Sequence, residues 1–146
     1  MNAQVFHKVM SVNVLSMLMC SKASAVRMFK GGSIINVSSI VSTKGFAGSS
    51  VYSASKGAID SLTRVLSAEL APKRIRVNAI NPGLVITEGT KAAGFTTGDY
   101  AKAWEAMATL GRAATPDDIG PVVVFLASSA SGWLTGENLN TTGGVR

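Results

Sequence analysis

Long stretches of helical periodicity alternate with short β-branched runs, and this alternation limits the possible folds more than any other feature of the sequence. Apolar side chains recur three or four residues apart in the helical stretches. The runs between them are rich in valine and isoleucine, as buried parallel strands are. The predicted helices cover residues 3–29, 51–71 and 115–128, and the predicted strands cover residues 33–38, 75–80 and 136–141.

Helices long enough to connect parallel strands predict an α/β fold with right-handed crossovers. Three strands make a small sheet, however, and a parallel sheet needs neighbours and cover on both faces. The sequence therefore predicts the last three strands of a larger doubly wound parallel sheet, with residues 1–146 in one domain. A polar stretch over residues 87–110 has one short helical piece at 100–110. Connections of this length are typically functional or disordered.

The composition predicts a globular protein of the reducing cytoplasm. Hydrophobic residues make up 47% of the chain and charged residues 15%. The single cysteine, Cys20, excludes an internal disulfide framework. No run reaches the ~18 consecutive apolar residues of a membrane span, and the first eight residues do not resemble a signal peptide. We therefore expect no membrane partner.

The net charge of +6, from 14 basic and 8 acidic residues, raises the hypothesis of a nucleic-acid partner. The basic residues are dispersed, apart from Lys73, Arg74 and Arg76, and no aromatic residues interleave with that group. A solvated helix end is the better interpretation, so no nucleic-acid partner is expected. His7 has no second ligand at suitable spacing, which argues against a metal site.

Tyr52 and Lys56 lie four residues apart at the start of the second long helix, so they share one helix face. A phenol with a pKa near 10 exchanges protons poorly at neutral pH, and a nearby ammonium lowers that pKa. Ser39 ends the first strand, where open α/β sheets place their ligands. Its hydroxyl can hydrogen-bond a carbonyl oxygen and a developing oxyanion.

The spacing Ser-x12-Tyr-x3-Lys is only modestly specific, because coincidence is on the order of a per cent. A helix-terminal tyrosine beside a solvated lysine is the alternative interpretation. The residues around the three side chains decide between the two.

Those surroundings strongly resemble the short-chain dehydrogenase/reductase family, and the resemblance covers essentially every residue. It rests first on Ile-Ile-Asn-Val-Ser-Ser, Tyr-Ser-Ala-Ser-Lys-Gly-Ala and Arg-Val-Asn-Ala-Ile-Asn-Pro-Gly, at residues 34–39, 52–58 and 76–83. Residues 9–14, 111–119, 125–128, 134–136 and 143–144 match as well. The resemblance implies a partial Rossmann-like sheet and NAD(P)-dependent hydride transfer between an alcohol and a carbonyl.

By this resemblance Tyr52 is the general acid/base and Ser39 holds the substrate oxygen. Lys56 lowers the pKa of Tyr52 and bonds the nicotinamide ribose. Asn13 anchors a water that relays protons to Lys56; a polar residue within a helix is its alternative interpretation. Asn78 and Asn81 are interpreted as turn and strand-end residues rather than as catalysts.

The resemblance also implies a cofactor contact, with NAD or NADP, after Pro82-Gly83. The backbone of Val85 meets the nicotinamide carboxamide, and Thr87 contacts the carboxamide or the pyrophosphate. Residues 87–110 form a substrate lid. Its expected apolar contacts, for which core packing is equally compatible, are Phe95, Tyr100, Trp104 and Met107.

The sequence lacks the glycine-rich turn that holds the pyrophosphate in this family. We therefore expect a truncated domain that binds a nicotinamide cofactor weakly by itself. A catalytically inactive remnant or an oligomerisation module is the alternative function. The expected partners are a small alcohol or carbonyl substrate and further copies of the chain in a homo-oligomer.

Overall fold

A three-stranded parallel sheet forms the centre of the computed structural model, which describes residues 2–28 and 31–145. The strands are β1 (Ser33–Val37), β2 (Arg76–Pro82) and β3 (Asn138–Thr141), in the order β1-β2-β3. Ser33 lies opposite Arg76, and Ala79 lies opposite Asn138. The predicted parallel α/β architecture is confirmed.

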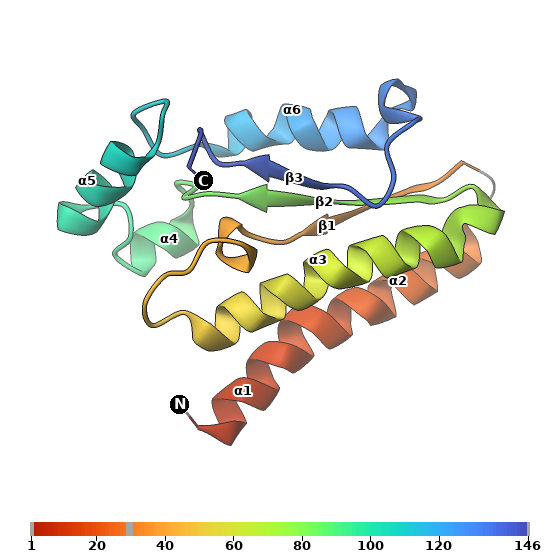
Figure 1. Cartoon of the computed structure of the whole chain (residues 1–146), viewed down its shortest axis with the longest axis horizontal. Helices are drawn as coiled ribbons and strands as arrows, with labels where there is room; N and C mark the ends of the chain where they lie inside the picture. The colour runs from red at the N-terminus through yellow and green to blue at the C-terminus, as the bar shows by residue number, and fades with distance from the viewer. Residues whose placement is uncertain (1, 29–30, 146) are drawn as a thin grey trace.

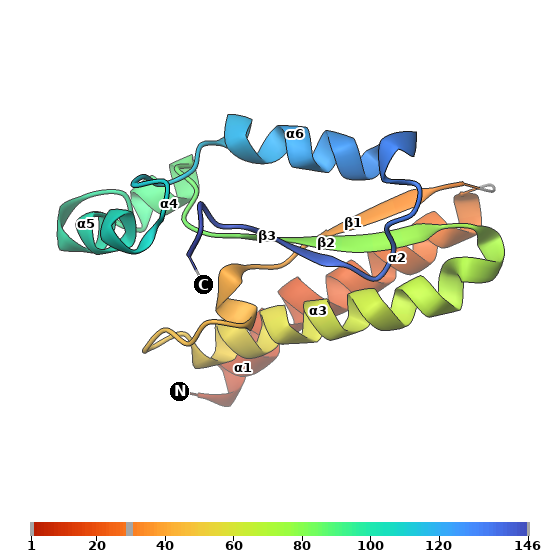
Figure 2. The same cartoon turned by 45° about the horizontal axis from the view of Figure 1, so that its top comes forward.

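Helices cover both faces of this sheet (Figures 1 and 2). One face carries the long N-terminal helix and α3, and the other face carries α6. The N-terminal helix comprises α1 (Ala3–Met10), a π-helical turn (Ser11–Leu15) and α2 (Ser16–Arg27). The others are α3 (Ser50–Leu70), α4 (Glu88–Ala92), α5 (Gly98–Met107) and α6 (Pro116–Ala127). Short 3-10 turns lie at Ile40–Ser42, Ala71–Lys73 and Ser129–Ser131.

The buried apolar residues form two clusters at opposite ends of the sheet. One cluster packs β1 and β2 against α2 and α3, with Ile34, Ile75 and Val77 at its centre. The other lies at the carboxyl ends of the strands and holds Trp104 and Leu84. The second cluster joins the lid segment to the sheet, because Trp104 belongs to α5.

Two expectations about the elements were wrong in detail. The lid contains two helices, α4 and α5, and α5 begins at Gly98 and ends at Met107. Thr87 starts α4 through a capping box with Thr90, whose small polar side chains give no apolar periodicity to detect. Strand β2 continues through Pro82, two residues beyond its predicted end at residue 80, because a proline is tolerated at a strand end.

The N-terminal helix buries a different face from the one that its periodicity predicted. Its buried residues are Ser21 and Ala25. The large apolar side chains Val5, Val12, Leu15, Met19 and Val26 are all more than half exposed. Ala25 belongs to the buried cluster of Ile34, Ile75 and Val77, and the apolar stripe faces outward. The predicted end of this helix at residue 29 lies outside the described residues.

The same helix, over Ala3–Arg27, is long and apolar enough to cross a membrane by length and composition alone. The helix contains no uninterrupted apolar run of that length, because serines and Asn13 interrupt it. The helix nevertheless packs on α3 and makes a side-chain hydrogen bond to it through Asn13. Such a contact is typical of a helix that covers one face of a sheet.

Asn78 is buried in the middle of β2, within the predicted strand 75–80, so it is neither a turn residue nor a strand-end residue. Its side chain donates to the Leu134 carbonyl at 2.9 Å and accepts from the Glu137 amide at 3.1 Å. These two bonds pair one backbone carbonyl and one backbone amide of the loop that leads into β3. Arg76, at the start of the same strand, donates to acceptors in residues 126–134 and fixes the other side of that loop.

Candidate active site

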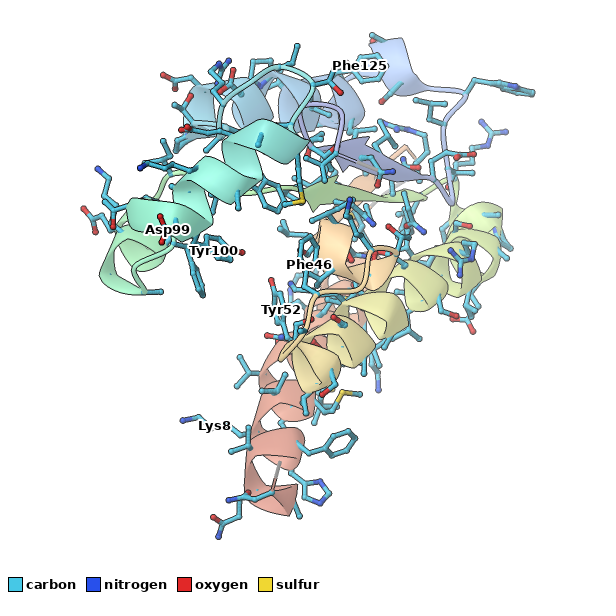
Figure 3. All side chains as sticks on the ribbon, turned by 60° about the vertical axis from the view of Figure 1, so that its left-hand side comes forward. Lys8, Phe46, Tyr52, Asp99, Tyr100 and Phe125 are labelled. Carbon is cyan, nitrogen blue, oxygen red and sulfur yellow. The ribbon has the colours of Figure 1, made fainter. Side chains whose placement is uncertain are left out.

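Ser39, Tyr52 and Lys56 come together at the carboxyl end of the sheet, where β1 ends and α3 begins. Tyr52 lies in the first turn of α3 and is 43% exposed, whereas Ser39 is nearly buried. Figure 3 shows Tyr52 on the near end of α3 and Tyr100 of the lid helix α5 on the other side of the opening. The phenol is therefore accessible from the side that the lid faces.

Ser39 is held in place by the turn that follows β1. It caps the 3-10 turn Ile40–Ser42, and its Oγ accepts from the Val41 amide at 3.4 Å. The Ser39 side chain also hydrogen-bonds the Tyr52 phenol. One hydroxyl thus connects the strand end to the helix start, and it faces the phenol oxygen.

Lys56 lies one turn after Tyr52, with its Nζ 5.5 Å from the centre of the Tyr52 ring. The ammonium donates to the Val37 carbonyl at 2.9 Å. Val37 ends β1 at the edge of the sheet that no described strand pairs. The neighbouring Ser38 donates its Oγ to the Lys56 carbonyl at 3.0 Å, so β1 and α3 are bonded at the level of the lysine.

Burial sets the protonation of both side chains. It raises the pKa of Tyr52, and the hydrogen bond from Ser39 opposes that rise. It lowers the pKa of Lys56, and the charge of Asp60 opposes that fall. Ser39 acts on the Tyr52 pKa in the direction that the resemblance implied for Lys56, whose own effect on the phenol stays a prediction. Tyr52 therefore stays a protonated phenol at neutral pH.

Asn13 reaches this site from the π-helical turn of the N-terminal helix. Its Nδ2 donates to the Ser55 Oγ at 3.0 Å, and Ser55 in turn donates to the Tyr52 carbonyl at 2.7 Å. Ser55 is fully buried. Sequence reasoning missed Ser55, although its position between Tyr52 and Lys56 was a usable signal. Asn13 and Lys56 line the same groove of about 490 Å³ beside β1.

The lid is joined to the site by aromatic packing. Trp104 is buried and stacks on Phe46, from the loop after β1, with ring centres 5.9 Å apart. A Cβ at Gly83 would come within 2.6 Å of the Trp104 ring, so this close approach requires the glycine. Phe95 and Tyr100 contact each other at 5.0 Å between ring centres and remain nearly half exposed. Trp104 is therefore core, whereas Phe95, Tyr100 and Met107 keep free surface.

The segment after β2 offers backbone groups near the site. Val85 bridges to Ala114, and the flanking Ile86 amide and Leu84 carbonyl bond to Ala114. The Val85 carbonyl accepts from Thr90 at 2.7 Å, and its amide has no acceptor within residues 2–28 and 31–145. Thr87 is exposed and uses its Oγ1 to cap α4.

Two further observations restrict the chemistry. A larger cavity, of about 1050 Å³, lies between α6 and the segment after β3, and none of Asn13, Ser39, Tyr52 and Lys56 lines it. Among the described residues, no group of three or more His, Cys, Asp or Glu side chains could hold a metal ion. The side chains that the candidate site presents are the Ser39 hydroxyl, the Tyr52 phenol, the Lys56 ammonium and the Asn13 amide.

The chain is similar to known oxidoreductases. The family model described as enoyl-(acyl carrier protein) reductase matches residues 1–146. An uncharacterized oxidoreductase of Methylorubrum extorquens is 45% identical over 97% of this chain and 57% of its own length. A 3-oxoacyl-[acyl-carrier-protein] reductase of Chlamydia pneumoniae is 38% identical over 99% of this chain and 58% of its own length.

Among solved structures, ElxO with NADP bound superimposes with a TM-score of 0.88 at 28% identity, covering 99% of this chain and 59% of that one. The chain thus spans little more than half the length of the relatives that it matches. The match nevertheless extends from the π-helical turn through β3, with Ser39, Tyr52 and Lys56 within it. The chain belongs to the short-chain dehydrogenase/reductase family of oxidoreductases.

Proposed function

We propose that the chain carries the proton-transfer half of an NAD(P)-dependent hydride transfer between an alcohol and a carbonyl, with Tyr52 as the general acid/base. The observation that supports this most directly is the grouping of Ser39, Tyr52 and Lys56 at the carboxyl end of the sheet. A partly exposed phenol beside a hydroxyl and an ammonium can exchange a proton with a bound oxygen.

The protonation of Tyr52 favours the reductive direction at neutral pH. Because burial raises its pKa, the phenol holds its proton and can donate it to a carbonyl oxygen. Ser39 can hydrogen-bond the same oxygen as charge develops on it. The Lys56 ammonium can then stabilise the phenolate that remains, since an opposite charge favours the ionised form.

The nicotinamide end of a cofactor fits the groups that this chain presents. A bound nicotinamide supplies or accepts the hydride. The Val85 amide lacks an acceptor within the described residues and can donate to a carboxamide oxygen. Lys56 can donate to ribose hydroxyls and Thr87 to the carboxamide or pyrophosphate. The bound NADP in the structure of ElxO supports this assignment, and so do Pro82 and Gly83, which bring the chain to Val85.

A chimera tests the proposal. This chain replaces the matching part of the Chlamydia pneumoniae reductase, and oxidation of NADPH by a 3-oxoacyl thioester is followed by absorbance. We expect a working chimera in which Tyr52→Phe lowers kcat by about 10²–10⁴ with cofactor affinity unchanged, because the phenol transfers the proton but binds little. Tyr100→Phe is the matched control. Equal turnover by chimera and Tyr52→Phe would remove Tyr52 from this role.

A second candidate function, self-association as an oligomerisation module, is favoured by the outward apolar stripe of the N-terminal helix. Val12, Leu15 and Met19 are each more than half exposed there. Analytical ultracentrifugation of the chain and of Leu15→Glu tests it. We expect the parent to associate and the variant to dissociate, because a buried carboxylate in an apolar contact is costly. Identical sedimentation of the two would exclude this stripe as the contact.

A further inference from the structure

Asp60 extends the row of chemically active side chains along α3. It lies one turn after Lys56 and two turns after Tyr52, so the three residues share one helix face. Unlike the other two, Asp60 is buried, with only 6% of its surface exposed. Aspartate is almost never buried unless it is paired, so this position calls for a partner.

The contacts of Asp60 are few and neutral. Its Oδ2 accepts from the Asn81 Nδ2 at 2.9 Å, and that amide also donates to Ser42. The Asp60 backbone carbonyl accepts from Asn138 at 3.3 Å. Oδ1 has no hydrogen-bond partner in the part of the chain that the structure describes.

Two cations of α3 lie one turn from Asp60. The turn after β1, β2 and β3 present Ser42, Asn81 and Asn138 to Asp60, and all three are uncharged. Lys56 precedes Asp60 by one turn and Arg64 follows it by one turn. Arg64 is exposed, and solvent screens its charge. Lys56 is the partly buried cation, and Asp60 opposes the lowering of its pKa by burial.

We propose that Asp60 is a positioning residue of this site, whose buried carboxylate keeps the Lys56 ammonium charged and thereby acts on Tyr52 only through that lysine. This inference rests on the proposed function of Tyr52 and Lys56. Asn81 belongs to the same arrangement, because it holds the Asp60 carboxylate and lies directly before the Pro82-Gly83 turn. The end of β2, which leads to the proposed nicotinamide contact, is thus hydrogen-bonded to the Asp60 carboxylate through Asn81.

The first experiment measures Lys56 itself and needs no catalysis. The chain is labelled with ¹³C-lysine, the Lys56 side-chain signal is assigned by its loss in Lys56→Arg, and its titration is followed by NMR. In Asp60→Asn, which keeps an oxygen for the Asn81 bond, we expect the Lys56 midpoint to move to lower pH. Glu69→Gln, an exposed charge on the same helix, is the matched control and leaves the midpoint unchanged. Asp60→Glu returns the midpoint toward that of the parent.

The second experiment reads the effect on catalysis through the pH dependence of kcat in the chimera. Loss of the Lys56 proton lowers kcat at high pH, so Asp60→Asn is expected to move this fall in kcat to lower pH. In Lys56→Arg, whose guanidinium stays charged, the same change should not move the profile.

A Lys56 midpoint that moves no more in Asp60→Asn than in Glu69→Gln would overturn the proposal. A shift of the kcat profile that Asp60→Asn also causes in Lys56→Arg would overturn it too. An inactive chimera would instead contradict the proposed function and would leave the Lys56 titration as it is. If Asp60→Asn fails to fold by circular dichroism, the comparison of Asp60→Glu with the parent gives the Lys56 readout. A midpoint far from that of the parent in this charge-conserving variant would then refute the assignment.

Discussion

Two effects shift the pKa of the Tyr52 phenol in opposite directions. Burial disfavours the phenolate, whereas the hydrogen bond from Ser39 favours it. The sequence predicted that these side chains meet, because the spacing of Tyr52 and Lys56 follows from helix geometry. It could not predict that the Lys56 ammonium donates to the Val37 carbonyl. That contact depends on how closely β1 approaches α3.

Ser39→Ala should raise the pKa of Tyr52 further, because it removes the hydrogen bond that opposes the effect of burial. The titration of phenolate absorbance in a Tyr100→Phe background measures this. Ser39→Thr keeps a hydroxyl at the same place and serves as control. A midpoint that falls in Ser39→Ala would show that Ser39 stabilises the neutral phenol instead.

The helices and strands follow the sequence closely where a long periodic segment decides them, as in α3 and β1. They diverge where a local polar contact decides, as in α4, whose start depends on Thr87 and Thr90. The N-terminal helix is the instructive case. Its periodicity identified a helix correctly, but large apolar residues face outward and small ones face the sheet. Periodicity shows that a stripe exists, and only packing shows which stripe is buried.

Arg76→Lys should lower the free energy of unfolding by about 2 kcal/mol, because the planar guanidinium makes more hydrogen bonds than an ammonium can replace. Arg76 donates to the carbonyls of Leu126, Ser128, Ser131 and Leu134 and to the Ser131 hydroxyl. Urea unfolding at constant m-value measures the change. Arg74→Lys, at an exposed neighbour, should stay within about 0.5 kcal/mol of the parent. A similar loss in both variants would contradict this account.

Across the whole molecule, the two faces of the sheet are covered and the outer edge of β1 is not paired within the described residues. Parallel sheets are normally covered on both faces and continue into further strands. The sequence predicted this arrangement from the number of strands and their alternation with helices. It also placed Ser39, Tyr52 and Lys56, the candidate catalytic residues, at one end of the sheet. Asp60 and Ser55 were not predicted as residues of the site, because their roles depend on burial and on partners that are distant along the chain.

The 146-residue chain by itself should bind NAD(H) and NADP(H) with dissociation constants well above micromolar. Lys56, Val85 and Thr87 can reach only the nicotinamide end, and each net hydrogen bond contributes roughly 0.5–3 kcal/mol before the cost of ordering the ligand. Micromolar binding needs about 8 kcal/mol. Isothermal titration calorimetry of monodisperse chain with both cofactors measures this. Micromolar affinity would mean that the chain holds a second part of the cofactor in residues not identified above.

The π-helical turn at Ser11–Leu15 holds one residue more than a turn of α-helix. The helical frames of α1 and α2 are therefore out of step by one position. Deletion of one residue in this turn would restore a regular helix and rotate α1 by about 100° relative to α2. The side of α1 that packs on α3 thus depends on the same turn that carries the bond between Asn13 and Ser55.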